Sequence, residues 1–135
     1  MSELIRFQSV VPNRHGRFPG VFALANGLAQ AHRLSEEDVR WWRSANDRAT
    51  AAYPDPERVA PGCYDPHRNP GARSWFRADA LDLLEMAREY LGLLDRYGVG
   101  WSELRTRTPG RVVYQDAVQV VAVPPTFEDD WPFTR

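Results

Sequence analysis

Residues 77–97 read RADALDLLEMAREYLGLLDRY, and this stretch decides the fold class. Apolar side chains recur along it every three or four positions, whereas acidic and arginine side chains form the opposite strip. Gly98 follows at once, as is typical of a helix C-cap. The width of the apolar arc predicts a central helix over residues 77–97 that packs against a sheet.

Two further helices are predicted before this one. A Pro-Gly pair precedes an apolar stripe that predicts a helix from Val21 to about Ala31, and Gly27 within it indicates close packing at that point. Ser35 is followed directly by acidic residues, which is a strong signal for the start of a helix. We expect this second helix to end near Tyr53.

Alternation of apolar and polar residues predicts the strands. From Leu4 to Val11 the pattern is that of a half-buried strand. Residues 102–108, 111–115 and 118–123 also have strand character, and a Thr-Pro-Gly-Arg turn joins the first two of these runs. They predict a three-stranded meander, which the first strand joins.

Strands and helices in this order predict an α+β fold. We expect a single domain over residues 1–125, with about four mostly antiparallel strands and three helices packed on one face. Residues 54–74 carry five prolines and are expected to be irregular but ordered. Residues 126–135 form an acidic aromatic tail, which we expect to dock on this chain or on a neighbouring one.

Composition excludes several classes of protein. The net charge of −1 argues against a protein that coats nucleic acid through bulk charge, and the absence of lysine among the 17 basic residues points to a GC-rich genome. A single cysteine excludes an internal disulfide. Because neither a signal peptide nor a membrane-spanning apolar run is visible, we expect a cytoplasmic location and no membrane partner.

Three segments carry a resemblance. The run PGVFALANGL at 19–28, the WWR and NDR triplets within 41–48, and PGRVVY at 109–114 resemble a group of small uncharacterised actinobacterial proteins. The similarity covers nearly the whole chain. No activity is assigned to that group, so the resemblance implies no function.

The first candidate site is the cationic turn before the first helix. Arg14, Arg17 and Gly20 lie between a strand and a helix N-terminus, where backbone N–H groups and the helix dipole favour an anion. The spacing matches no named phosphate-binding loop. We predict an anion-binding site at these residues.

The second candidate site is a sheet face. In the strand after Trp101, Arg105 and Arg107 are expected to point away from the helices. The polar residues Arg6 and Gln8 of the first strand are expected on the same side. Such an open polar face could bind an anionic or extended partner, although a solvated outer face explains it equally well.

His15 is the candidate catalytic residue. Flanking arginines favour its neutral form, which suits a general base, but a surface histidine in a basic loop is the plainer explanation. Cys63, Asp65 and His67 lack the second ligand pair of a zinc site, so we expect packing and turn hydrogen bonds there. No metal and no cofactor are predicted.

Three classes of function stay open. The first is a binding module whose Arg-rich turn or sheet face takes a phosphate-bearing or acidic partner: an anionic small molecule, a nucleic acid or a protein. The second is a small enzyme that acts on a nucleotide or nucleic acid, with His15 as general base. The third is a structural subunit of a homo-oligomer. The binding module is preferred because no catalytic constellation stands out.

Overall fold

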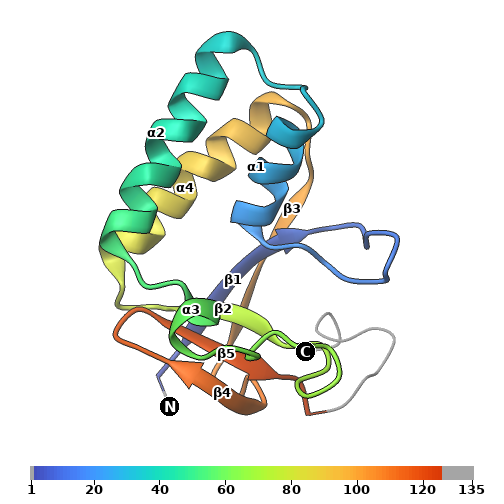
Figure 1. Ribbon diagram of the computed structural model, residues 1–135, viewed down its shortest axis with the longest axis vertical. Helices are drawn as coiled ribbons and strands as arrows, with labels where there is room; N and C mark the ends of the chain where they lie inside the picture. Colours follow the sequence, from blue (N-terminus) through green and yellow to red (C-terminus); the bar gives the residue numbers. More distant parts are fainter. Residues whose placement is uncertain (1, 126–135) are drawn as a thin grey trace.

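The central helix is α4, Leu81–Arg96, in a computed structural model that describes residues 2–125 (Figure 1). Its predicted apolar arc is buried at Leu83, Leu84, Ala87, Tyr90, Leu91 and Leu94, and Leu93 is buried in addition. The helix begins four residues later than the predicted start at Arg77. Residues 73–77 instead form a strand, so the prediction for this end of the helix was wrong.

Two long helices and one short helix accompany α4. They are α1 (Val21–Gln30), α2 (Glu36–Ala52) and the single turn α3 (Pro56–Val59). Ser35 is the predicted N-cap of α2, and its Oγ accepts from the Asp38 N–H at 3.1 Å. The close packing expected at Gly27 is wrong, because a Cβ added there would meet no atom within 4 Å.

The sheet has five strands rather than about four, and every pairing is antiparallel. Its order is β3-β1-β2-β5-β4. The strands are β1 (Leu4–Ser9), β2 (Arg73–Arg77), β3 (Trp101–Thr106), β4 (Arg111–Gln115) and β5 (Gln119–Val123). The coarse α+β prediction is therefore confirmed, and β2 is the strand that it missed.

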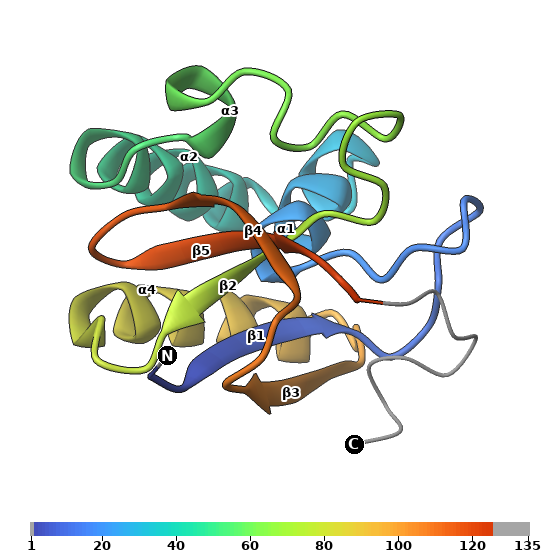
Figure 2. The same ribbon diagram turned by 90° about the horizontal axis from the view of Figure 1, so that it is seen from below.

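The predicted meander does not form, because β3 and β4 occupy opposite edges of the sheet. β3 pairs with β1, and β4 pairs with β5. The chain between them passes across the sheet on the side away from the helices (Figure 2). The turn at 108–111 is thus a crossing and not a hairpin.

Two apolar clusters lie on the two faces of the sheet. The larger one joins Ile5, Phe7 and Phe76 to the helices. The smaller one joins Leu4 and Trp75 to Val120 and Ala122, and side chains from both edge strands pack against it. The sheet must therefore curl until its edges converge on one cluster. As a result β1 is buried along its whole length instead of on one face.

Two further predictions concern the C-terminal tail and the membrane. The tail at 126–135 lies outside the described residues, so its docking stays a prediction. Within residues 2–125, no helix combines the length and the apolar character that crossing a membrane requires.

Candidate anion-binding site

The site lies where the sheet opens between β1 and β2. Their pairing consists of Leu4 with Arg77 and Ile5 with Phe76. Further along β1, the segment that leads into α1 comes alongside, and Gln8 forms an isolated bridge with Gly20. The Ser9 N–H donates to the Pro19 carbonyl at 2.9 Å. The two central strands therefore diverge, with the start of α1 beside the gap.

Arg6 fills this gap. Its Nη1 donates to the Ser74 carbonyl at 2.9 Å, and its Nη2 donates to the Phe18 carbonyl at 2.8 Å. Its Nε donates to Gln8 Oε1 at 2.7 Å. The residue is only 8% exposed, so a full positive charge is buried against neutral acceptors. Among residues 2–125, no carboxylate forms an ion pair with it.

Gly20 allows this approach. A Cβ at that position would lie 3.3 Å from Arg6 Nη1, which is tighter than ordinary van der Waals contact. Gly20 is also the N-cap of α1, whose first turn has no side-chain cap and no acidic residue. The positive end of the helix dipole is therefore uncompensated by side chains of α1 itself.

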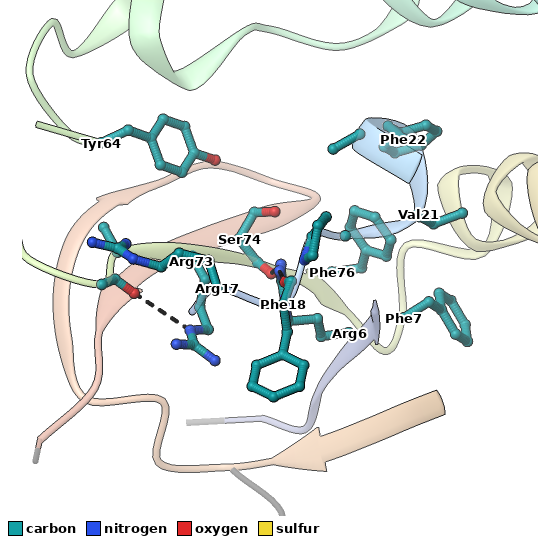
Figure 3. Close-up of a pocket in the computed structure, with 15 residues that line it drawn as sticks. Arg6, Phe7, Arg17, Phe18, Val21, Phe22, Tyr64, Arg73, Ser74 and Phe76 are labelled. Carbon is teal, nitrogen blue, oxygen red and sulfur yellow. Dashed lines mark hydrogen bonds between the residues drawn. The ribbon is translucent and has the colours of Figure 1, made fainter. Parts of the chain in front are cut away.

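A cavity of about 320 Å³ lies beside Arg6 (Figure 3). Arg17 and Arg73 line it together with Arg6, and the rest of its wall is aromatic, aliphatic and backbone apart from Ser74. None of its described lining residues is acidic. Three arginines thus converge on one hollow without a carboxylate among the described residues around it.

Burial and mutual repulsion both disfavour the cationic forms of Arg6 and Arg73. Burial, and then the charge of Arg73, lower the pKa of Arg6 to about 9. Burial, and then the charge of Arg17, lower the pKa of Arg73 to about 10. Both shifts mean that the cationic forms are disfavoured relative to water. An anion in the cavity would favour both cationic forms, because it would place an opposite charge beside them.

Asn13 places Arg17 at the cavity. Its Oδ1 accepts from the backbone N–H groups of His15 and Arg17, at 2.9 Å and 3.0 Å. The Asn13 N–H donates in turn to the Arg17 carbonyl at 2.7 Å, and Gly16 takes a φ of 73° within this turn. The loop is closed on itself, whereas the Arg17 side chain is exposed and forms no hydrogen bond to another described residue.

The cavity brings together parts of both predicted sites. Arg17 and Gly20 come from the predicted turn, and Arg6 comes from the predicted sheet face. Arg14 and His15 are exposed and do not line it, and Arg14 Nε lies 3.3 Å from His15 Nε2. The candidate general base is therefore not part of this arrangement.

The predicted open sheet face does not exist. Arg6 and Gln8 are buried because the curled sheet encloses that side of β1. The register places Arg105 opposite Ile5, on the other face, where it pairs with Glu3 and Glu103 at 2.6 Å each. Arg107 lies beyond the end of β3 and is exposed. These four residues cannot form one surface.

The Cys63 segment is a set of turns. Asp65 Oδ1 accepts from the His67 N–H at 2.8 Å, and Asn69 Nδ2 donates to the Gly62 carbonyl at 2.8 Å, as predicted. Cys63 is buried, and burial together with the nearby Glu57 raises the pKa of its thiol to about 11. Within the described part of the chain, no three histidine, cysteine or acidic side chains are placed to hold a metal.

Sequence reasoning missed Arg73 and Ser74. Both were counted in the irregular segment at 54–74, although they begin β2. The signal that could have found them is the run Arg73–Arg77, in which aromatic residues of high β propensity follow Gly71. Their approach to Arg6 depends on the strand order, which the sequence does not reveal.

No protein-family model, no curated protein and no solved structure matches this chain. The resemblance to actinobacterial proteins stays a prediction.

Proposed function

We propose that this protein is a binding module for a phosphate-bearing small molecule, which it holds in the cavity lined by Arg6, Arg17 and Arg73. The single observation that carries the proposal is the convergence of these three guanidinium groups on a hollow with no acidic residue among its described lining. Guanidinium groups match the oxygens of a phosphate in charge and in bidentate geometry.

The three arginines have different tasks in this proposal. Arg6 is committed to the carbonyls of Phe18 and Ser74, so it holds the gap open and contributes charge. Arg17 is exposed, and its guanidinium is available to contact a ligand directly. Arg73 lines the same cavity and lies near enough to Arg17 for the two charges to repel. An anion would bind between Arg17 and Arg73, with the buried charge of Arg6 behind it.

Binding without catalysis is favoured over the enzymatic alternative. The described lining contains no histidine, aspartate, glutamate or cysteine, so it offers no ordinary general base at pH 7. His15 belongs to the neighbouring loop and does not line the cavity. An enzyme with His15 as base, a nucleic-acid partner and a homo-oligomer remain predictions that no contact in the described residues favours.

Thermal unfolding in phosphate tests the proposal. A ligand that binds only the folded state stabilises it by about 2.7 kcal/mol at a hundred times its Kd. We expect phosphate to raise the Tm of the wild type more than chloride of equal ionic strength does. Arg17→Gln should remove most of that difference, because it deletes the accessible guanidinium.

Arg14→Gln is the matched control. It removes the same charge from the same exposed loop but from a residue that does not line the cavity. It should leave the effect of phosphate intact. If both variants lose the effect equally, or if phosphate and chloride act alike on the wild type, the proposal is wrong.

A further inference from the structure

A second hollow adjoins the arginine cavity. It has a volume of about 760 Å³ and shares four lining residues with the first: Phe22, Tyr64, Ser74 and Phe76. In Figure 3 the Tyr64 hydroxyl is directed toward Ser74 between them. The far wall comes from α2, α3 and the segment before α3. The two hollows are therefore neighbours that share these side chains. We call the pair the cleft, and their volumes suit a ligand of small-molecule size.

Amide groups in the second compartment are locked in orientation. The Trp42 Nε1–H donates to Asn26 Oδ1 at 2.9 Å, and Asn46 Nδ2 donates to the same oxygen at 3.2 Å. The Tyr90 hydroxyl donates to Asn46 Oδ1. An indole N–H can only donate, so it fixes which end of the Asn26 amide faces it.

This network leaves hydrogen-bond donors for a ligand. With its oxygen held by Trp42 and Asn46, Asn26 has its Nδ2 group at the other end of the amide. That group makes no hydrogen bond to another residue in the described chain, and Asn26 lines the compartment. A fixed donor of this kind selects a ligand with an acceptor atom, because the Asn26 amide cannot flip to present its oxygen to a donor on the ligand.

The aromatic side of the compartment is also rigid. The Phe22 ring packs edge-on against Tyr90 with centroids 4.7 Å apart, and against Phe76 with centroids 5.8 Å apart. Both Phe22 and Phe76 line the compartment. A flat ring beside them would gain apolar contact without displacing either side chain.

We infer that the cleft takes a nucleoside monophosphate, with the phosphate in the arginine cavity and the base in the amide compartment. A base offers both a flat ring for the aromatic wall and ring or carbonyl acceptors for the Asn26 amide. This inference rests on the proposed function, because the arginine cavity must first hold the phosphate.

Calorimetric binding of small phosphates to the full chain tests the inference. The probes are inorganic phosphate, ribose 5-phosphate, phenyl phosphate and the monophosphates of adenosine, guanosine, cytidine and uridine. At least one nucleotide should bind about tenfold or more tightly than ribose 5-phosphate, which is a typical effect of stacking a base. The same nucleotide should also bind more tightly than phenyl phosphate, which has a ring without acceptors.

Asn26→Asp locates the effect. The substitution keeps an oxygen for Trp42 and Asn46 but replaces the free donor with an acceptor. The advantage of the nucleotide over ribose 5-phosphate should fall several-fold. Gln30→Glu is the control, since it makes the same charge change at an exposed position of α1 that does not line the compartment. It should preserve the advantage.

The outcomes separate the two proposals. Suppose that ribose 5-phosphate binds and that its binding needs Arg17. If no nucleotide then binds more tightly than ribose 5-phosphate, or if phenyl phosphate alone does, the nucleotide inference is overturned and the anion site stands. If no phosphate binds at all, both are overturned. If Asn26→Asp leaves the affinity of the nucleotide relative to ribose 5-phosphate unchanged, the inference is also overturned. If that variant does not fold, the comparison of ligands on the wild type still tests the inference.

Discussion

At the scale of single residues, the Tyr97 hydroxyl connects two helices. It donates to Asp38 Oδ2 at 2.6 Å and accepts from the Ser35 N–H at 2.9 Å, so it ties the end of α4 to the start of α2. This hydrogen bond is the main reason why the pKa of Asp38 lies below its ordinary value, and Arg96 adds to it. The ionised carboxylate is therefore favoured in the folded state.

We expect Tyr97→Phe to raise the pKa of Asp38 and to lower the free energy of unfolding at pH 7 by about 1–2 kcal/mol. A carboxyl whose pKa is lowered on folding stabilises the folded state at pH values above its pKa in the unfolded chain. This stabilisation is lost as the pH falls through the pKa of the folded state. The difference from wild type should therefore shrink toward pH 2. Urea unfolding and NMR titration measure both effects.

Arg96→Gln serves as the comparison, because Arg96 forms an exposed ion pair with the same carboxylate. Such pairs contribute little, so this variant should lose less stability than Tyr97→Phe. An Asp38 pKa that is identical in wild type and Tyr97→Phe would contradict the account.

Arg6 shows what residue patterns predict and what they leave out. Its alternation with Ile5 and Phe7 correctly places it on the other side of β1 from the helices. The pattern cannot tell whether that side faces water. It faces a second cluster because the sheet curls, and this depends on contacts between residues far apart in the chain.

At the scale of elements, α4 is the part of the fold that is most readable from sequence. Leu84 is 2% exposed on its buried face, whereas Leu81 in the first turn is 71% exposed. Leu84→Asp should abolish cooperative unfolding, because it would bury an unpaired carboxylate. Leu81→Asp should melt close to wild type. Similar melting curves for both variants would show that the buried face is assigned wrongly.

The crossing between β3 and β4 depends on Gly110. Its φ is 111°, and a Cβ there would lie 2.0 Å from the Val123 carbonyl oxygen. We expect Gly110→Ala to cost about 3 kcal/mol or more, through backbone strain and steric clash. Gly27→Ala should have the opposite sign and add about 0.5–1 kcal/mol, because its helix has room for a methyl group.

Equilibrium unfolding of both glycine variants checks these signs. A stable Gly110→Ala protein would mean that β4 does not approach β5 as closely as described. The Pro-Gly pair at 109–110 predicted the turn of a hairpin; the hairpin does not form, although Gly110 takes the positive φ that such a turn needs. The pair could not reveal whether the strands before and after it are hydrogen-bonded to each other. The same turn residues occur in hairpins and in crossings between distant strands.

At the scale of the whole molecule, the candidate site is a product of strand order. Helix α1 enters beside β1 where β2 leaves it, and the gap between them holds Arg6. Arg17 and Arg73 are 56 positions apart in the chain and meet only through this arrangement. Sequence patterns therefore predicted the cationic turn but not Arg73, which lines the same cavity.

The most direct test of the anion site is a crystal of the protein soaked in tungstate, which mimics phosphate and scatters anomalously. We expect an anomalous peak inside the cavity, with its oxygens at hydrogen-bond distance, about 2.7–3.2 Å, from the guanidinium groups of Arg17 and Arg73. The Arg17→Gln crystal should lose the peak. An empty cavity in crystals that bind tungstate elsewhere, at Arg14 for example, would contradict the account.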